Sequence, residues 1–332
     1  MSNESNLMAK KPLNPVANTL LHFVQGNLGI LIALFVLCAI VAFISPVFLS
    51  AGNFLNVLRQ VSLNASLAIG MMMVILLGGI DLSVGAVVGL SGTLSVGLID
   101  SGAGVIPAVL IAACCGIFIG FINGCIISFL NMAPFIVTMS TMNIARGLAF
   151  IYTGGLPIRS TDRVFSIIGA GKTGPIPNPV IYMMAIIIIV SILLGRSKFG
   201  LRVYALGGNR EAAKFSGINV RLIEIIVYTI SGFLSGFAGI VLASRMYSGQ
   251  PGVASGAELD AIAACVVGGV SMSGGLGKIS GVVIGVLIVG VISNGLNLMN
   301  INSFWQSVLK GCIVLIAVYI DIVRKRRQFH DA

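Results

Sequence analysis

Polar side chains that stand inside long apolar stretches are the first candidates for chemistry in this sequence. Seven of them carry amide or guanidinium groups, and the five selected as candidates are Asn64, Asn143, Arg146, Asn294 and Asn297, beside Asn123 and Gln306. Groups of this kind in apolar helices usually face a bundle interior or a wet pathway, because lipid offers them no hydrogen bonds. They hydrogen-bond hydroxyl groups, so they are suited to line a path for a sugar. The alternative, which the sequence leaves open, is that they hydrogen-bond neighbouring helices.

A second polar interruption lies at residues 78–85, which read GGIDLSVG between two apolar runs. The two glycines weaken a helix there, and Asp81 is an ionisable group near membrane depth, which needs a partner. The segment is either a re-entrant turn capped by Asp81 or Ser83, or a hinge that contacts a partner through Gly79, Asp81 and Ser83. A similar string, GGVSMSGG, recurs at 268–275 and suggests an internal repeat, a common way to build transporters.

The third candidate is a polar, basic stretch at 196–221 between two apolar runs. Within it, residues 208–216 have the composition of a short helix. An asparagine can cap the start, a glutamate lies in the first turn, where the helix dipole favours it, and a glycine can end the helix. A short polar helix on the surface of a membrane domain can serve as a handle for a soluble partner. The residues that we expect to carry this contact are Asn209, Glu211, Ala212, Ala213 and Gly217.

The elements that position these candidates must lie in a membrane. Of the 332 residues, 57% are hydrophobic and only 9% are charged, which is more apolar surface than a water-soluble fold can hide. The apolar residues form blocks near the ~20 residues that cross a ~30 Å hydrocarbon layer. Ten such blocks follow one another, at 27–45, 58–79, 83–99, 104–129, 133–153, 178–195, 222–243, 259–273, 279–297 and 304–322.

Helices are the elements that fit these blocks, because lipid cannot satisfy open backbone groups. We therefore expect an all-α integral membrane protein with about ten transmembrane helices. The blocks 83–99 and 259–273 are short and interrupted by glycine or polar residues, so they are candidates for broken or re-entrant helices. The chain then divides into a tail at 1–26, a transmembrane domain at 27–322 and a basic tail at 323–332.

Basic residues indicate which side of the membrane each loop faces, because cytosolic loops are enriched in lysine and arginine. They cluster before the first block, in the 196–221 stretch and in the tail at 323–332. An even number of expected spans separates each cluster from the next. Both termini and the 196–221 stretch are therefore expected in the cytosol, and residues 154–177 outside. The net charge of +10 then lies mostly beside anionic lipid headgroups, and nucleic acid is not an expected partner.

Several kinds of activity lack the residues that they need. Residues 166–173 read SIIGAGKT, one glycine short of a phosphate-binding loop, and no strand is expected before them. The only histidines, His22 and His330, lie near the ends of the chain, and no catalytic or metal-binding pattern is present. The six cysteines lie in apolar runs, which favours a packing role. We therefore expect no enzyme, no cofactor and no metal site.

Several strings in a fixed order resemble the permeases of bacterial ABC importers for ribose and other monosaccharides. They are GGIDLSVG at 78–85, ALGGNREAA at 205–213, SGINV at 216–220, ELDAIAA at 258–264 and NGLNL at 294–298. The resemblance covers the chain from about residue 28 to residue 322. The Glu-Ala-Ala pattern at 211–213, with Gly217 after it, is similar to the loop by which such permeases dock their ATPase.

The resemblance implies a set of partners and a mode of action. A second permease copy, an ATP-binding subunit and a periplasmic or lipid-anchored sugar-binding protein would assemble with the chain in the bacterial inner membrane. ATP hydrolysis on the partner would rock the permease between outward-open and inward-open forms through the helix at 208–216. The main alternative is a secondary transporter driven by an ion gradient, which needs acidic residues inside the membrane. Asp81, Glu258 and Asp260 all lie near the ends of expected spans.

Overall fold

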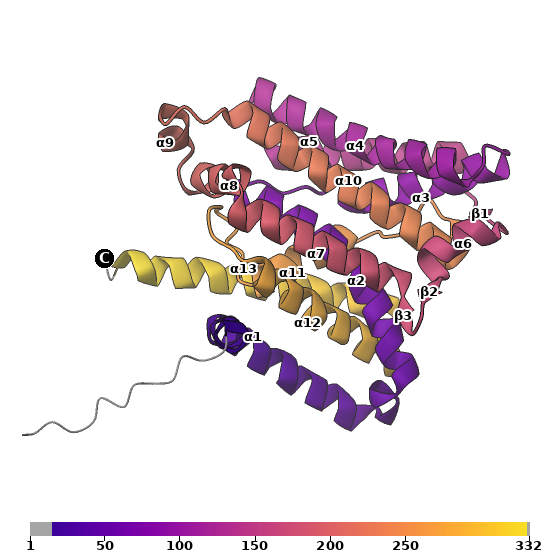
Figure 1. Cartoon of the computed structure of the whole chain (residues 1–332), viewed down its shortest axis with the longest axis horizontal. Helices are drawn as coiled ribbons and strands as arrows, with labels where there is room; N and C mark the ends of the chain where they lie inside the picture. Colours follow the sequence, from indigo (N-terminus) through magenta and orange to yellow (C-terminus); the bar gives the residue numbers. More distant parts are fainter. Residues whose placement is uncertain (1–14, 331–332) are drawn as a thin grey trace, which may run out of the picture.

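The computed structural model describes residues 15–330, and Figure 1 shows a bundle of helices that lie mostly along one direction. The long helices are α1 (Pro15–Ile44), α2 (Ala51–Leu76), α3 (Val84–Asp100), α4 (Val105–Leu130), α5 (Pro134–Thr153), α7 (Asn178–Arg196), α10 (Val220–Met246), α12 (Ile279–Leu298) and α13 (Ser303–His330). The short ones are η1 (Pro46–Leu49), α6 (Arg163–Ala170), α8 (Lys198–Gly208), α9 (Arg210–Phe215) and α11 (Ala257–Val267). Two small antiparallel ladders pair β1 (Ile158–Arg159) with β4 (Ser248–Gly249), and β2 (Lys172–Thr173) with β3 (Ile176–Pro177). The mostly helical architecture agrees with an all-α membrane protein.

Within residues 15–330, seven helices are long and apolar enough to cross a membrane: α1, α2, α4, α5, α7, α10 and α12. The block predicted at 83–99 forms the unbroken helix α3, which has 17 residues. The block predicted at 259–273 is instead the 11-residue helix α11. At about 1.5 Å per residue, α11 rises only about 16 Å, roughly half of the hydrocarbon layer. It is therefore a partial span.

The two terminal helices differ most from the expected boundaries. α1 begins at Pro15 rather than at residue 27, because neither glycine nor proline interrupts the sequence between Pro15 and Gly26. α13 continues to His330, so most of the expected tail at 323–332 is helical. The remaining parts of the expected tails, 1–14 and 331–332, lie outside the described residues.

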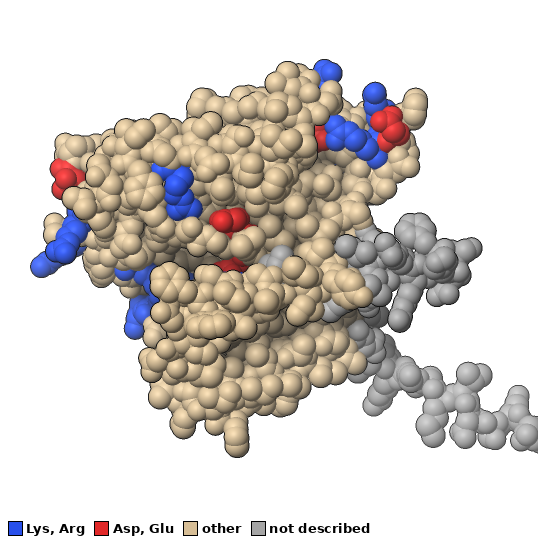
Figure 2. All heavy atoms as spheres, turned by 180° about the vertical axis from the view of Figure 1, so that it is seen from behind, with Lys and Arg blue, Asp and Glu red and all other residues tan. Residues whose placement is uncertain are grey.

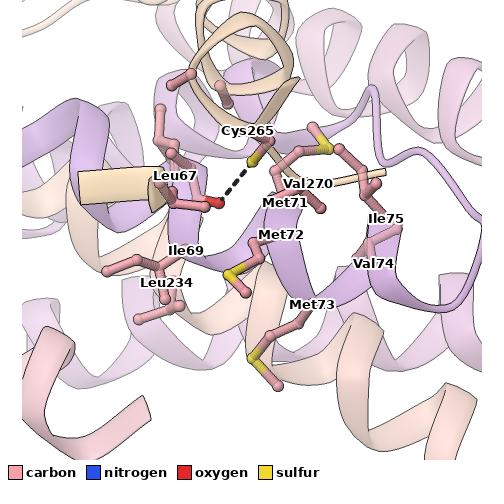
Figure 3. Packing of buried hydrophobic residues seen from close by; sticks show 14 of the residues in the cluster. Leu67, Ile69, Met71, Met72, Met73, Val74, Ile75, Leu234, Cys265 and Val270 are labelled. Carbon is pink, nitrogen blue, oxygen red and sulfur yellow. Dashed lines mark hydrogen bonds between the residues drawn. The ribbon is translucent and has the colours of Figure 1, made fainter. Parts of the chain in front are cut away.

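The centre of the bundle is α2, in which every residue from Ala65 to Leu76 is buried. Figure 3 shows Met71, Met72 and Met73 filling the space around it, as flexible thioether side chains do well. The buried thiol of Cys265 donates to the carbonyl of Ala68 at 3.2 Å, which agrees with a packing role for this cysteine. In the most apolar stretch of α2, α10 and α12, more than half of the residues are buried. In α1, α4, α5 and α7 the buried share is less than a third. The first three helices therefore form the inner layer.

The closest helix pair, α4 and α10, packs backbone against backbone. Gly116, Gly120 and Gly124 are spaced four apart and lie along one face of α4. A Cβ atom at Gly120 would overlap the carbonyl oxygen of Tyr228, and one at Gly232 would overlap that of Gly116. Small residues at this spacing let two helices approach closely in a membrane, so the stripe fixes α10 against the outer layer.

The bundle has two distinct ends. Figure 1 shows α8, α9, the described start of α1 and the end of α13 together at one end, which we call the α9 end. α6, β1, β2 and β3 lie at the opposite end, which we call the α6 end. Figure 2 shows most charged side chains toward the two ends, with a flank between them that is largely uncharged apart from acidic side chains near its middle. A flank of this kind is what a bilayer requires.

Candidate functional site

The stretch 196–221 folds into two helices rather than one. The predicted helix at 208–216 is confirmed as α9, which spans Arg210–Phe215. The side chain of Asn209 caps it by accepting from the amide of Ala212 at 2.9 Å, and Glu211 lies in the first turn. Gly217 ends it with a φ of 78°, a left-handed conformation that favours glycine.

The second helix, α8 (Lys198–Gly208), was not predicted from the sequence. Ser197 caps it by accepting from the amide of Gly200 at 3.1 Å. One face, formed by Gly200, Val203 and Leu206, is buried. A serine followed by apolar residues at three-residue spacing is a helix signal. The basic residues between these positions make the stretch resemble a polar loop, so the signal was missed.

α8 lies directly on the backbone of two other segments. A Cβ atom at Gly207 would overlap the carbonyl oxygen of Leu76, where α2 ends, and would approach the amide nitrogen of Gly275 to 2.6 Å. The amide of Gly275 donates to the same Leu76 oxygen at 3.0 Å. We call the meeting of Leu76, Gly207, Gly274 and Gly275 the glycine junction. It joins α8 to α2 and to the loop at 268–278.

A phenol strengthens the same contact. The hydroxyl of Tyr204, on α8, donates to the carbonyl of Gly277 at 2.9 Å. Burial raises the pKa of Tyr204, so the phenol remains a neutral donor at physiological pH. α8 therefore has two attachment points on the loop that precedes α12.

α9 has its own attachment, to α10. Arg210 forms an ion pair with Glu224, in which its second nitrogen lies 3.3 Å from the second carboxylate oxygen. The Glu224 side chain is almost completely buried and that of Arg210 is half-exposed. Both residues line a cavity of about 330 Å³ together with Gly79 and Tyr228. The predicted partner-contact helix and the predicted hinge segment thus share one cavity, through the predicted Gly79 and through Arg210, Glu224 and Tyr228, which sequence reasoning missed.

The segment 78–85 forms a turn around a buried carboxylate, and the predicted cap is absent because neither Asp81 nor Ser83 accepts from an amide in the first turn of α3. Asp81 is 1% exposed, and one of its oxygens accepts from the amide of Ser83 at 3.0 Å and from its hydroxyl. The other oxygen accepts from the hydroxyl of Ser231 on α10 at 2.8 Å. Asn123 on α4 donates to the Ser83 hydroxyl at 3.1 Å. No basic side chain in the described part pairs with Asp81, so hydroxyls and an amide satisfy it. The hinge role of this segment stays a prediction.

The two glycine strings of the suggested repeat end their helices in the same way. Gly78 follows α2 with a φ of 79°, and Gly269 follows α11 with a φ of 82°. The next amide donates back five residues in both places, from Gly79 to Val74 at 3.1 Å and from Val270 to Cys265 at 2.9 Å. Gly154 after α5 and Gly217 after α9 end their helices with the same geometry, which is common at helix ends, so the internal repeat stays a prediction.

The five polar candidates for a sugar path do not come together. Asn294 exchanges two hydrogen bonds with Asn53 on α2, at 3.0 and 2.8 Å. Asn297 accepts from Gln306 on α13 at 2.8 Å. Both contacts therefore fit the second interpretation of these residues, in which their amides hydrogen-bond neighbouring helices. Asn143 is exposed on α5 and donates to its own helix, at Met139, over 3.1 Å.

Arg146 and Asn64 have different surroundings. Arg146 donates to the carbonyls of Pro251 and Val253, at 3.3 and 3.0 Å. These carbonyls belong to the non-helical segment 250–256 that precedes α11. Asn64 lines a cavity between α2, α3, α10, α11 and α13. The other four candidates do not line this cavity.

The string at 166–173 has a packing role. It covers the end of α6 and the whole of β2, and the strand before it, β1, has only two residues. The amide of Gly169 donates to the hydroxyl of Ser244 at 2.7 Å, and a Cβ atom there would overlap the carbonyl of Val241. Gly169 thus allows α6 to contact α10. Among the described residues, no group of three or more histidine, cysteine, aspartate or glutamate side chains could hold a metal ion.

Comparison with known proteins identifies the class of this bundle. Residues 53–318 match the family model described as branched-chain amino acid transport system / permease component. The ribose import permease protein RbsC of Bacillus subtilis (strain 168) is 47% identical over 305 residues, which cover 91% of this chain and 95% of that protein. The galactose/methyl galactoside import permease protein MglC of Escherichia coli (strain K12) is 39% identical over 319 residues, 90% and 95% of the two chains. The L-arabinose ABC transporter permease protein AraH of Azospirillum brasilense is 37% identical over 300 residues, 90% and 88% of the two chains.

No solved structure matches the chain. The family model covers most of the bundle, from near the start of α2 to within α13. The relatives are similar over nearly their whole length, so the likeness extends well beyond a shared motif. The chain is a multi-pass membrane protein that belongs to the branched-chain amino acid transport system / permease component family.

Proposed function

We propose that this chain is the membrane-spanning permease subunit of an ABC importer for a monosaccharide, ribose or a related sugar. Three relatives that are similar over most of their length carry the names of ribose, galactose and arabinose permeases. The single structural observation that supports the proposal is α9. It is a capped polar helix attached to the bundle at Arg210 and Glu224, and it presents Phe215, which is 87% exposed.

The partners follow from the two ends of the bundle. An ATP-binding subunit docks at the α9 end, where α9 offers a polar helix with an apolar tip. A sugar-binding protein delivers the sugar at the α6 end, and a second permease copy completes the importer. The α9 end then faces the cytosol of a bacterial inner membrane, with both termini on that side. This orientation is supported by the placement of α8, α9 and the described chain ends together.

Transport by reconstituted protein tests the proposal. The chain, its ATPase and its sugar-binding protein are placed in lipid vesicles, and uptake of labelled pentoses and hexoses is measured with ATP supplied on the ATPase side. We expect uptake of ribose or a related sugar that requires ATP and persists when proton and sodium gradients are collapsed. Uptake that needs an ion gradient and ignores ATP would instead establish the secondary transporter.

Labelling of single cysteines tests the orientation. Lys172 at the α6 end and Lys214 at the α9 end are both exposed. Each is replaced by cysteine in a protein whose six native cysteines have been removed. In intact cells, an impermeant thiol reagent should modify the cysteine at 172 and leave the one at 214 untouched. The reverse pattern would invert the orientation of the whole bundle.

A further inference from the structure

A basic pocket lies at the α9 end, between α9, the end of α4 and the start of α10. Its volume is about 420 Å³, and its charged lining consists of Arg210, Glu211, Lys214 and Arg221. Arg210 is already paired with Glu224, so two further cations face one further carboxylate. Figure 2 shows blue and red side chains gathered at this end, beside the tan flank. The pocket is therefore net positive and lies at the border of the apolar surface.

The two further cations have no acidic partner in the described part of the chain. Neither Lys214 nor Arg221 forms an ion pair with a described residue. The guanidinium of Arg221 lies instead over the ring of Phe129 on α4, 5.4 Å from its centre. This cation–π contact orients the arginine but leaves its N–H donors available. An anion in the pocket would give both cations a partner.

The wall of the pocket that α4 provides continues into a surface for lipid. Phe129 and Leu130, the last two residues of α4, are more than half exposed. Leu222, in the first turn of α10, is 49% exposed. A cationic side chain that rests on apolar surface and keeps its charged head at the boundary is typical of a membrane interface. The pocket is thus placed where the headgroup of a lipid lies.

A shallow apolar groove follows the same face of α4 deeper into the bundle. Its lining includes Leu94 of α3 and Ile111, Phe118 and Phe121 of α4. Phe118 and Phe129 are separated by about three helical turns, which places them on one face and about 16 Å apart along the axis. That distance is close to half of the ~30 Å hydrocarbon layer, the depth of one leaflet. The pocket and the groove together have the layout of a headgroup and its acyl chains.

We propose that an anionic phospholipid binds at this place, with its phosphate between Lys214 and Arg221. Basic pockets beside membrane helices bind anionic headgroups. The side chain of Asn219 accepts from the amide of Leu222 at 3.1 Å, so its own N–H groups remain as donors to the phosphate. Free phosphate has the same charge chemistry but no chains for the groove on α4. The lipid connects α9 to α4 and α10, and the site requires only a membrane protein, not a sugar importer.

Quenching of tryptophan fluorescence tests which lipid lies at the pocket. Phe129→Trp and Phe35→Trp are made separately in protein carrying Trp305→Phe, which removes the only native tryptophan. Phe35 is a matched control, because it is an exposed phenylalanine on the outer helix α1. The purified chain is reconstituted in phosphatidylcholine with a rising fraction of phosphatidylglycerol, and bromine on the acyl chains of either lipid quenches a nearby tryptophan.

The expected result is a preference for phosphatidylglycerol at position 129 alone. Each basic side chain beside a charged lipid surface contributes roughly a fivefold preference, so we expect at least about tenfold for the two. Position 35 should show no preference. Because the attraction is electrostatic, the preference should disappear near 1 M salt, where the Debye length is about 3 Å. Equal quenching by the two lipids at position 129 in low salt would overturn the site, and this measurement needs no charge variant to fold.

Removal of charge assigns the preference to the two side chains. Lys214→Gln with Arg221→Gln should reduce it to within about twofold. Lys172→Gln with Arg163→Gln removes the same two charge types from exposed positions at the α6 end and should leave it intact. A preference that survives in the first double variant would overturn the proposal.

Two further outcomes would assign the pocket to another ligand. Inorganic phosphate at ~10 mM should leave the fluorescence at position 129 unchanged, and a change without any lipid preference would identify free phosphate as the ligand. If the Lys214→Gln, Arg221→Gln variant loses ATPase binding but keeps its lipid preference, the two cations contact the protein partner. Either result would overturn the lipid site and leave the proposed function standing.

Discussion

α8 and α9 are adjacent in sequence and differ in what they contact. The backbone of α8 packs directly against α2 and the 268–278 loop at the glycine junction, and the face of α8 that carries Val203 and Leu206 is buried. In α9 only Ala213 is buried, and Phe215 at its end is 87% exposed. The Glu-Ala-Ala pattern, on α9, marks the helix that is free to meet a partner. The helix that can pass a movement on to the bundle is α8, which carries no such pattern.

The difference suggests two separate requirements for coupling. A docking helix needs an exposed surface and a local cap, whereas a transmitting helix needs close contact with elements far away in sequence. Gly207 and Leu76 are brought together only by the fold. Variants that affect one helix and spare the other therefore test whether the two roles are distinct.

The largest effect is expected at the glycine junction. Gly207→Ala places a Cβ atom against the carbonyl of Leu76, and overpacking of this kind costs up to about 3 kcal/mol. Gly208→Ala is the matched control, since nothing lies within 4 Å of the added atom. Both glycines are helical, so alanine is favoured by intrinsic propensity at both positions. Uptake should fall at least about tenfold for Gly207→Ala, equivalent to ~1.4 kcal/mol, and stay near normal for Gly208→Ala.

Membrane levels and binding of the ATPase are measured for both alanine variants. Equal uptake by the two, at equal levels in the membrane, would show that the glycine junction transmits nothing. If Gly207→Ala retains ATPase binding while losing uptake, docking and transmission are separate.

The next effect concerns the attachment of α9. Arg210→Gln leaves the buried carboxylate of Glu224 without its cation, which costs about 1–3 kcal/mol. The double variant Arg210→Gln with Glu224→Gln restores neutrality and should recover part of the loss. Thermal unfolding of the purified protein and uptake measure the two changes. A double variant no better than Arg210→Gln would mean that the pair contributes little.

The smallest effect is the helix cap of α9. Asn209→Ala removes the acceptor for the amide of Ala212, at a typical cost of ~1 kcal/mol. Asn209→Asp preserves an acceptor and should behave like the parent protein. The sugar transported per ATP hydrolysed is the sensitive readout, and it should fall modestly for alanine alone. A fall with aspartate as well would point to a direct contact of Asn209 with the ATPase.

The predictable features were those encoded locally. Asn209, Glu211 and Gly217 belong to one short stretch, and each does in α9 what its residue type favours there. The turn at 78–85 was likewise predicted from eight consecutive residues, although no side chain caps the helix that follows it. The same glycine and polar interruptions suggested broken helices at 83–99 and at 259–273, but only the second block is shortened, to α11, whereas α3 is unbroken.

The rest depends on contacts between distant residues. The environment of Asn64 and that of Asn294 cannot be told apart by residue type, yet one lines a cavity and the other pairs with Asn53. From the sequence, Asp260 is predicted to lie near the end of a span. In the structure it lies in a cavity and pairs with Lys310, because α11 is short. Polar residues in apolar helices identify candidates, and the tertiary fold decides which of them meet a ligand.

The contact between α9 and the ATPase is the measurement that tests the central claim most directly. Cysteine in place of Phe215 carries a photoreactive cross-linker in the assembled importer, and cysteine in place of Lys172 at the α6 end serves as the control. We predict that the probe at 215 cross-links to the ATP-binding subunit, with a yield that changes when ATP is bound, and that the probe at 172 does not. An assembled, transport-active importer in which position 215 reaches no ATPase would contradict the account.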